Sequence, residues 1–121
     1  MFIKTESKKD FLIVRLRGEL DMDAVSKFRN RVIELMEEKK LNNLLLDMAE
    51  VQFIDSTGIG VLLGRYREIK SQGGELVLIN LDKNIRRLLK LSGILNLVDV
   101  YENENEAINN QMKEGGNFLA Q

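Results

Sequence analysis

Asp47-Met-Ala-Glu-Val-Gln-Phe-Ile-Asp-Ser-Thr-Gly-Ile-Gly-Val-Leu-Leu-Gly64 is the stretch that decides the fold, because it predicts a strand, a tight turn and a helix start in direct succession. The preceding Leu44-Leu45-Leu46 has the apolar density of a strand buried on both faces, which implies helices above and below a sheet. Asp55-Ser56-Thr57 supplies residue types that accept hydrogen bonds from the free N–H groups of a helix's first turn. We therefore expect a helix capped by Asp55 or Ser56.

The helix that follows this cap has one apolar face and one charged face. Gly73-Gly74 is predicted to end it. Gly60 and Gly64 lie one turn apart within it, and each costs a helix about 1 kcal/mol relative to alanine. We expect this cost to be offset by close packing of the helix against the sheet at both glycines. The apolar face is formed by Ile59, Leu62, Leu63, Tyr66 and Ile69.

Strand and helix signals alternate along the rest of the chain. Gly18 is predicted to end the second strand, and Gly93 the third helix. The order predicts an α/β fold with a mixed, mostly parallel sheet of about five strands and about four helices. The predicted strands are residues 2–7, 11–17, 43–48, 75–80 and 97–101. The other predicted helix caps are Asp21 or Asp23, Asp82, and Asn103 with Glu106 as its capping box.

The length and composition of the chain predict one domain. It has 121 residues, of which 44% are hydrophobic, and this is material for one core. The last predicted helix carries Ala107, Ile108 and Met112 and ends at Gly115-Gly116. We expect a domain over residues 1–114 and a frayed tail over residues 115–121.

Charge and residue usage exclude several classes of function. Eighteen basic and nineteen acidic residues give a net charge of −1, so the chain has no general attraction for nucleic acid or an anionic membrane. Without cysteine or histidine it has no disulfide, no thiolate, no tetrahedral zinc site and no histidine base. No apolar run has the length of a membrane span or the position of a signal peptide. These features predict a cytoplasmic protein that is not an enzyme and has no cofactor.

The hydroxyls of Ser56 and Thr57 have two interpretations. By frequency, Ser and Thr at a helix start are caps and nothing more. The alternative is a modified hydroxyl, because the helix dipole and free N–H groups favour an added phosphate by about 0.3 to 1 kcal/mol. Phosphate at this place would change the surface without unfolding the helix.

Two further segments invite a functional interpretation. The glycines from Gly58 to Gly64 match neither nucleotide-binding loop pattern, so close packing explains them better than a nucleotide. The acidic segment Glu19-Leu20-Asp21-Met22-Asp23 is explained by helix capping and solvation. If both helix-leading loops share one edge of the sheet, however, these carboxylates and Ser56 would form one surface for a protein partner.

Several of these motifs together resemble the bacterial anti-sigma-factor antagonists of the STAS domain family. They are Gly18-Glu19-Leu20-Asp21, the run from Phe53 to Tyr66 with Asp55-Ser56-Thr57-Gly58-Ile59-Gly60, then Gly73-Gly74-Glu75, and Leu91-Ser92-Gly93-Ile94. They occur in the order and spacing of the family. Gly64-Arg65-Tyr66 and Glu68-Ile69-Lys70 are most similar to its sporulation branch.

The resemblance implies a switch. In this family an anti-sigma factor that is itself a serine kinase phosphorylates the serine after the aspartate, which is Ser56 here. The unphosphorylated antagonist binds the anti-sigma factor and frees the sigma factor. The phosphorylated antagonist cannot bind until a serine phosphatase removes the phosphate. Thr57 replaces a second serine of some members and is the alternative acceptor. The partner-binding residues implied by the resemblance and the acidic surface are Asp21, Asp23, Asp55, Ser56, Thr57 and Gly58.

Two other classes of function are open from the sequence. One is a STAS scaffold or regulatory module unconnected with a sigma factor. The other is a small nucleotide-binding protein, which the missing histidine and cysteine disfavour.

Overall fold

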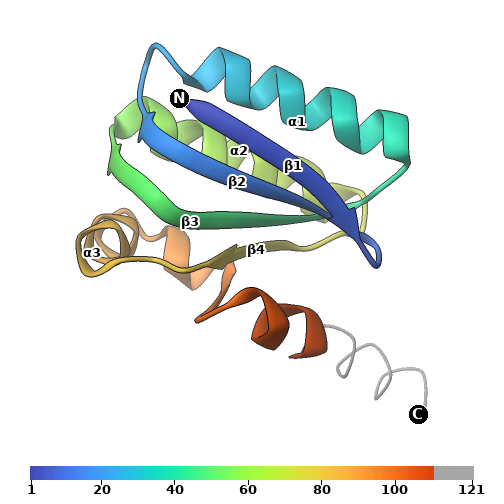
Figure 1. The fold of residues 1–121 in the computed structure, drawn as a ribbon. Coiled ribbons are helices and arrows are strands. Elements are labelled where there is room, and N and C mark those ends of the chain that lie inside the picture. The colour runs from blue at the N-terminus through green and yellow to red at the C-terminus, as the bar shows by residue number, and fades with distance from the viewer. Residues whose placement is uncertain (111–121) are drawn as a thin grey trace.

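The strands of this computed structural model form one mixed sheet, and the structure describes residues 1–110 (Figure 1). Five strands lie in the order β1-β2-β3-β4-β5. β1 is antiparallel to β2, and every later neighbour pair is parallel. The α/β fold with a mostly parallel sheet is therefore confirmed. The strands are β1 (Phe2–Lys8), β2 (Phe11–Leu20), β3 (Asn43–Ile54), β4 (Leu76–Ile79) and β5 (Asp99–Tyr101).

Two strands run further than the sequence predicts. β2 passes through Gly18, whose φ of 108° a glycine can adopt, and ends at Leu20. β3 does not stop at Met48 but continues to Ile54. Two register shifts against β2 absorb extra residues of β3, one between Asp47 and Glu50 and one at Gln52. Both expected boundaries were wrong, because β2 accommodates Gly18 and because β3 accommodates the extra residue between Asp47 and Glu50 as a bulge.

The helices begin and end close to the predicted residues. They are α1 (Val25–Lys39), α2 (Ser56–Ser71), α3 (Lys83–Leu91) and the short 3-10 helix η1 (Ile94–Asn96), and residues 104–110 are also helical. Asp55 caps α2, Asp82 caps α3, and the Asn103 carboxamide accepts from the Glu106 N–H. The Gly74 N–H bonds to the Ile69 carbonyl at the end of α2. Met112, Gly115-Gly116, the boundary at residue 114 and the tail 115–121 lie outside the described residues.

Both faces of the sheet carry an apolar layer, as Leu44-Leu45-Leu46 predicts. Leu44 and Leu46 join the larger layer, which α1, α2 and α3 cover. Leu45 faces the opposite side with Phe11 and Ile13, under residues 104–110. No helix of the described chain is long and apolar enough to cross a bilayer.

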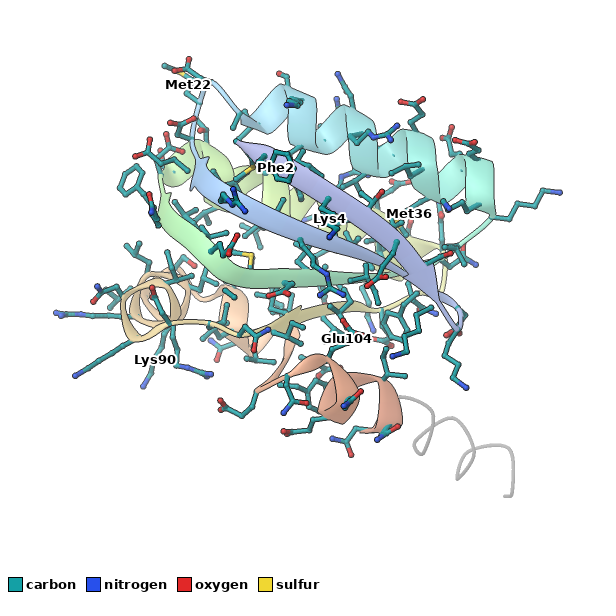
Figure 2. The ribbon with its side chains drawn as sticks, in the orientation of Figure 1. Phe2, Lys4, Met22, Met36, Lys90 and Glu104 are labelled. Atoms are coloured by element: carbon teal, nitrogen blue, oxygen red, sulfur yellow. The ribbon has the colours of Figure 1, made fainter. Side chains whose placement is uncertain are left out.

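Arg15 holds the segment 104–110 against the second face of the sheet through Glu104, which Figure 2 labels. Its guanidinium donates to Asp47 at 2.9 Å, to Glu104 at 2.8 Å and to Glu6. These bonds, led by that to Glu104, raise the pKa of Arg15. The same pairing lowers the pKa of Glu104, and Lys8 adds to the effect. One cation thus connects β1, β3 and the C-terminal segment.

Glu104→Gln is expected to lower the free energy of unfolding by about 1 kcal/mol at neutral pH, because its pair with Arg15 is partly open to water. Since the folded pKa of Glu104 lies below its ordinary value of 4.5, the stabilisation is complete above that value and is lost as the pH falls through the folded pKa. Urea unfolding of wild type and variant should differ at neutral pH and converge in acid. Glu106→Gln, an exposed change on the same helix, should have no effect. A difference that persists in acid would contradict this prediction.

Candidate functional site

The loops that lead into α1 and α2 meet at one edge of the sheet. β2 and β3 are parallel neighbours, so Leu20 and Ile54 end side by side. The Asp55 N–H donates to the Leu20 carbonyl at 3.3 Å, and the Met22 N–H donates to the Asp55 carboxylate at 3.0 Å. Figure 2 shows Met22 on the loop between β2 and α1. The two loops thus share one edge of the sheet, which is the condition under which their carboxylates and Ser56 were expected to form one surface.

Asp55 ties these two loops together. Its Oδ1 accepts from the Gly58 N–H at 2.9 Å and from the Thr57 hydroxyl at 2.5 Å, while Oδ2 accepts from Met22. The Thr57 hydroxyl first, and then the Gly58 N–H, lower the pKa of Asp55. This carboxylate is consequently charged and occupied on both oxygens, which suits a cap and makes it a weak base.

Ser56 is the first residue of α2 and is exposed to solvent. Within residues 1–110 its hydroxyl has no hydrogen-bond partner. Thr57 is also exposed, but its hydroxyl donates to Asp55. Of the two exposed hydroxyls, that of Ser56 is therefore the one without a hydrogen bond within the described residues.

Gly58 packs against the end of β2. A Cβ added there would lie 2.2 Å from the Leu20 carbonyl oxygen, so only glycine allows α2 to come this close. The expectation for Gly60 and Gly64 was wrong, because an added Cβ at either would meet nothing within 4 Å. The close approaches occur instead in the first turn of α2, at Gly58, and in the turn after α2, at Gly74 beside the Asn42 carbonyl.

The acidic loop is fixed by its own side chain. Asp21 Oδ1 accepts from the N–H groups of Asp23 at 3.1 Å and Ala24 at 3.2 Å. It thus caps the turn before α1, whose own cap position is Ala24, and Asp23 makes no such bond and is exposed. Within the described chain none of the carboxylates of Glu19, Asp21, Asp23 and Asp55 has an ion-pair partner. This edge therefore carries carboxylates that no ion pair within the described chain neutralises, with Lys27 as the cation that lines the same hollow as Glu19, Asp21 and Asp23.

The roles of three residues of the site, Leu20, Met22 and Phe53, were not found from the sequence. The Leu20 carbonyl and the Met22 N–H are backbone groups, which carry no residue-type signal. The side chains of Met22 and Phe53 are exposed by 70% and 47%. Phe53 lies beyond the predicted strand 43–48 and carries no sequence signal of exposure, and the register shift at Gln52 is what turns it outward.

The family model of the STAS domain matches residues 2–107. The chain belongs to the STAS domain family. It is 36% identical over 106 residues to the anti-sigma F factor antagonist of Paenibacillus polymyxa, with 88% of this chain and 91% of the relative covered. The resemblance inferred from the motifs is therefore confirmed.

Two solved structures share this STAS fold. A Thermotoga maritima protein assigned as an anti-sigma factor antagonist superimposes with a TM-score of 0.84 at 25% identity, covering 89% of this chain and 92% of that one. The phosphorylated form of the Bacillus cell fate determinant SpoIIAA superimposes with a TM-score of 0.70 at 27% identity, covering 90% and 98%.

Gly58→Ala is expected to lower the free energy of unfolding by about 1 to 3 kcal/mol, because its Cβ would collide with a backbone carbonyl. Gly60→Ala, two residues along the same helix, is the matched control. It should raise that free energy by about 0.4 to 1 kcal/mol, since the added methyl meets open space and removes freedom from the unfolded chain. Urea denaturation measures both values. Equal effects of the two substitutions would contradict the packing described for Gly58.

Proposed function

We propose that this protein is an anti-sigma factor antagonist that binds an anti-sigma factor serine kinase, releases the sigma factor, and is switched off by phosphorylation of Ser56. One observation carries the proposal. The Ser56 hydroxyl is exposed and makes no hydrogen bond within residues 1–110, whereas the neighbouring Thr57 hydroxyl donates to Asp55. The names of the curated relatives and the phosphorylated state of SpoIIAA support it.

The phosphoryl transfer requires only a nucleophile from this chain. The Ser56 oxygen attacks the γ-phosphorus of ATP, the bond from that phosphorus to the β–γ bridging oxygen breaks, and ADP leaves. The hydroxyl proton passes to a base of the kinase, because Asp55 has a lowered pKa and both of its oxygens accept hydrogen bonds. The kinase thus supplies the catalytic groups, and this chain supplies the acceptor hydroxyl and the binding surface.

A phosphate on Ser56 would oppose binding through charge and size. It adds a charge of about −1.5 to −2 to an edge that already holds Asp21, Asp23 and Asp55. At an assumed separation of about 7 Å and an effective dielectric of about 20, each added charge raises the energy by about 2.4 kcal/mol against an acidic group of the partner. Since about 1.4 kcal/mol is a tenfold change in affinity, binding can end without any movement of the backbone.

Phosphate on Ser56 is compatible with the fold. Ser56 is at the positive end of the α2 dipole and makes no side-chain hydrogen bond within residues 1–110 that phosphate would break. Asp55 carries the cap, so capping and phosphorylation are assigned to different residues. A serine phosphatase can then restore the binding form by hydrolysis of the phosphoester. We place this cycle in the cytoplasm, where ATP and sigma factors are found.

Ser56→Ala is expected to abolish incorporation of phosphate from ATP on incubation with the anti-sigma factor kinase, because the attacking oxygen is gone. Thr57→Ala is the matched control and should still be phosphorylated. Mass spectrometry of the intact proteins gives the stoichiometry for both. Phosphate on the Ser56→Ala variant would contradict the proposed acceptor.

Ser56→Asp is expected to weaken binding to the same anti-sigma factor by about tenfold or more, since it adds charge at the acceptor position. Ser56→Asn has nearly the same shape without the charge and should bind much more like wild type. Isothermal titration calorimetry with the unmodified proteins compares the three dissociation constants. Equal loss in both variants would assign the effect to size and would contradict electrostatic switching.

A further inference from the structure

Two large apolar side chains that the core does not use lie at the edge that carries Ser56. Met22 follows β2, whereas Phe53 comes from the end of β3, where it pairs with Glu19. They are 31 positions apart in sequence and are brought to one edge by the hydrogen bond from the Met22 N–H to Asp55, two residues after Phe53. Exposed Met and aromatic side chains gathered in this way are typical of the energetic centre of a protein interface. We propose that Met22 and Phe53 are the apolar anchors by which this protein holds its anti-sigma factor.

The backbone presents Met22 on a fixed turn. Its own N–H is bonded to Asp55, and the flanking turn is closed by bonds from Ala24 and Val25 to the Asp21 carbonyl. A long apolar side chain therefore stands in water on a loop that has already lost its backbone freedom. Binding then costs the ordering of the side chain alone, which favours a tight complex. Methionine also adapts its shape to an irregular apolar pocket.

Charge around the anchors identifies the chemistry of the partner surface. The four unpaired carboxylates of Glu19, Asp21, Asp23 and Asp55 come from the same two segments as Met22 and Phe53. An apolar centre with an acidic rim is complementary to an apolar depression bordered by lysine and arginine. The occupant of this surface is thus a protein face of that kind on the anti-sigma factor.

This inference rests on the proposed function. It assigns the rate of dissociation and the rate of association to different side chains. Apolar anchors govern chiefly the rate of dissociation, whereas rim charges govern the rate of association and its dependence on salt. Met22 and Phe53 accordingly set how long the complex lasts, the acidic rim sets how fast it forms, and the state of Ser56 decides whether it forms at all.

The experiment measures association and dissociation rates of the full chain with the anti-sigma factor kinase loaded with ADP, by surface plasmon resonance. Met22→Ser and Phe53→Ser should each raise the dissociation constant about tenfold or more, mostly through faster dissociation. Asp23→Asn should mainly slow association. Leu91→Ser is the matched control, because Leu91 is 77% exposed at the far end of α3, and it should change the dissociation constant less than twofold.

Thermal unfolding of each variant shows that the fold is intact, and Met22→Ser keeps the test valid even if Phe53→Ser loses stability, since Met22 is the more exposed. If wild type binds but Met22→Ser and Phe53→Ser bind as Leu91→Ser does, the anchors are wrong and the proposed function stands. If wild type neither binds the kinase nor accepts phosphate from it, the proposed function is wrong, and the assignment of Met22 and Phe53 as anchors is wrong with it.

Discussion

The Asp55 carboxylate is the constraint on which the candidate site depends. It accepts hydrogen bonds from the first turn of its own helix and from the loop after β2, so one side chain caps α2 and fixes the neighbouring loop. Those bonds also engage the Thr57 hydroxyl and leave the Ser56 hydroxyl unbonded within the described chain. The two adjacent hydroxyls therefore differ in their hydrogen bonding, and the proposed choice of Ser56 as the acceptor rests on this difference.

The edge that carries Asp55 is built on a sheet whose strands are buried on both faces where helices cover them. Most of the buried apolar residues belong to the layer under α1, α2 and α3, while the second layer is small and includes residues of the segment 104–110. Arg15 secures that smaller layer with three carboxylates. The carboxyl edge is left outside both layers, so its surface can change charge without disturbing the packing beneath.

Regulation by phosphate fits a site built in this way. A hydroxyl at a helix start is exposed, close to backbone N–H groups, and separate from the residue that caps the helix. Gly58 lets α2 approach Leu20 closely, which fixes the position of Ser56 relative to the acidic loop. The same edge displays Met22 and Phe53, so the proposed recognition and the proposed switch share one surface but use different side chains.

The sequence alone determined the order of strands and helices, the cap at Asp82, the ends of α2 and α3 before Gly73-Gly74 and Gly93, and the family, because each depends on local residue preferences or on a contiguous motif. It left the cap of α2 open between Asp55 and Ser56, which the structure assigns to Asp55. It misplaced the ends of β2 and β3 and the role of Gly60 and Gly64, because bulges and close approaches are properties of the neighbouring strand. Only the tertiary structure decided that Met22 is bonded to Asp55, that Phe53 faces water, and that Ser56 rather than Thr57 has the unbonded hydroxyl. These facts depend on the parallel pairing of β2 with β3, a contact between segments more than thirty residues apart that no local pattern encodes.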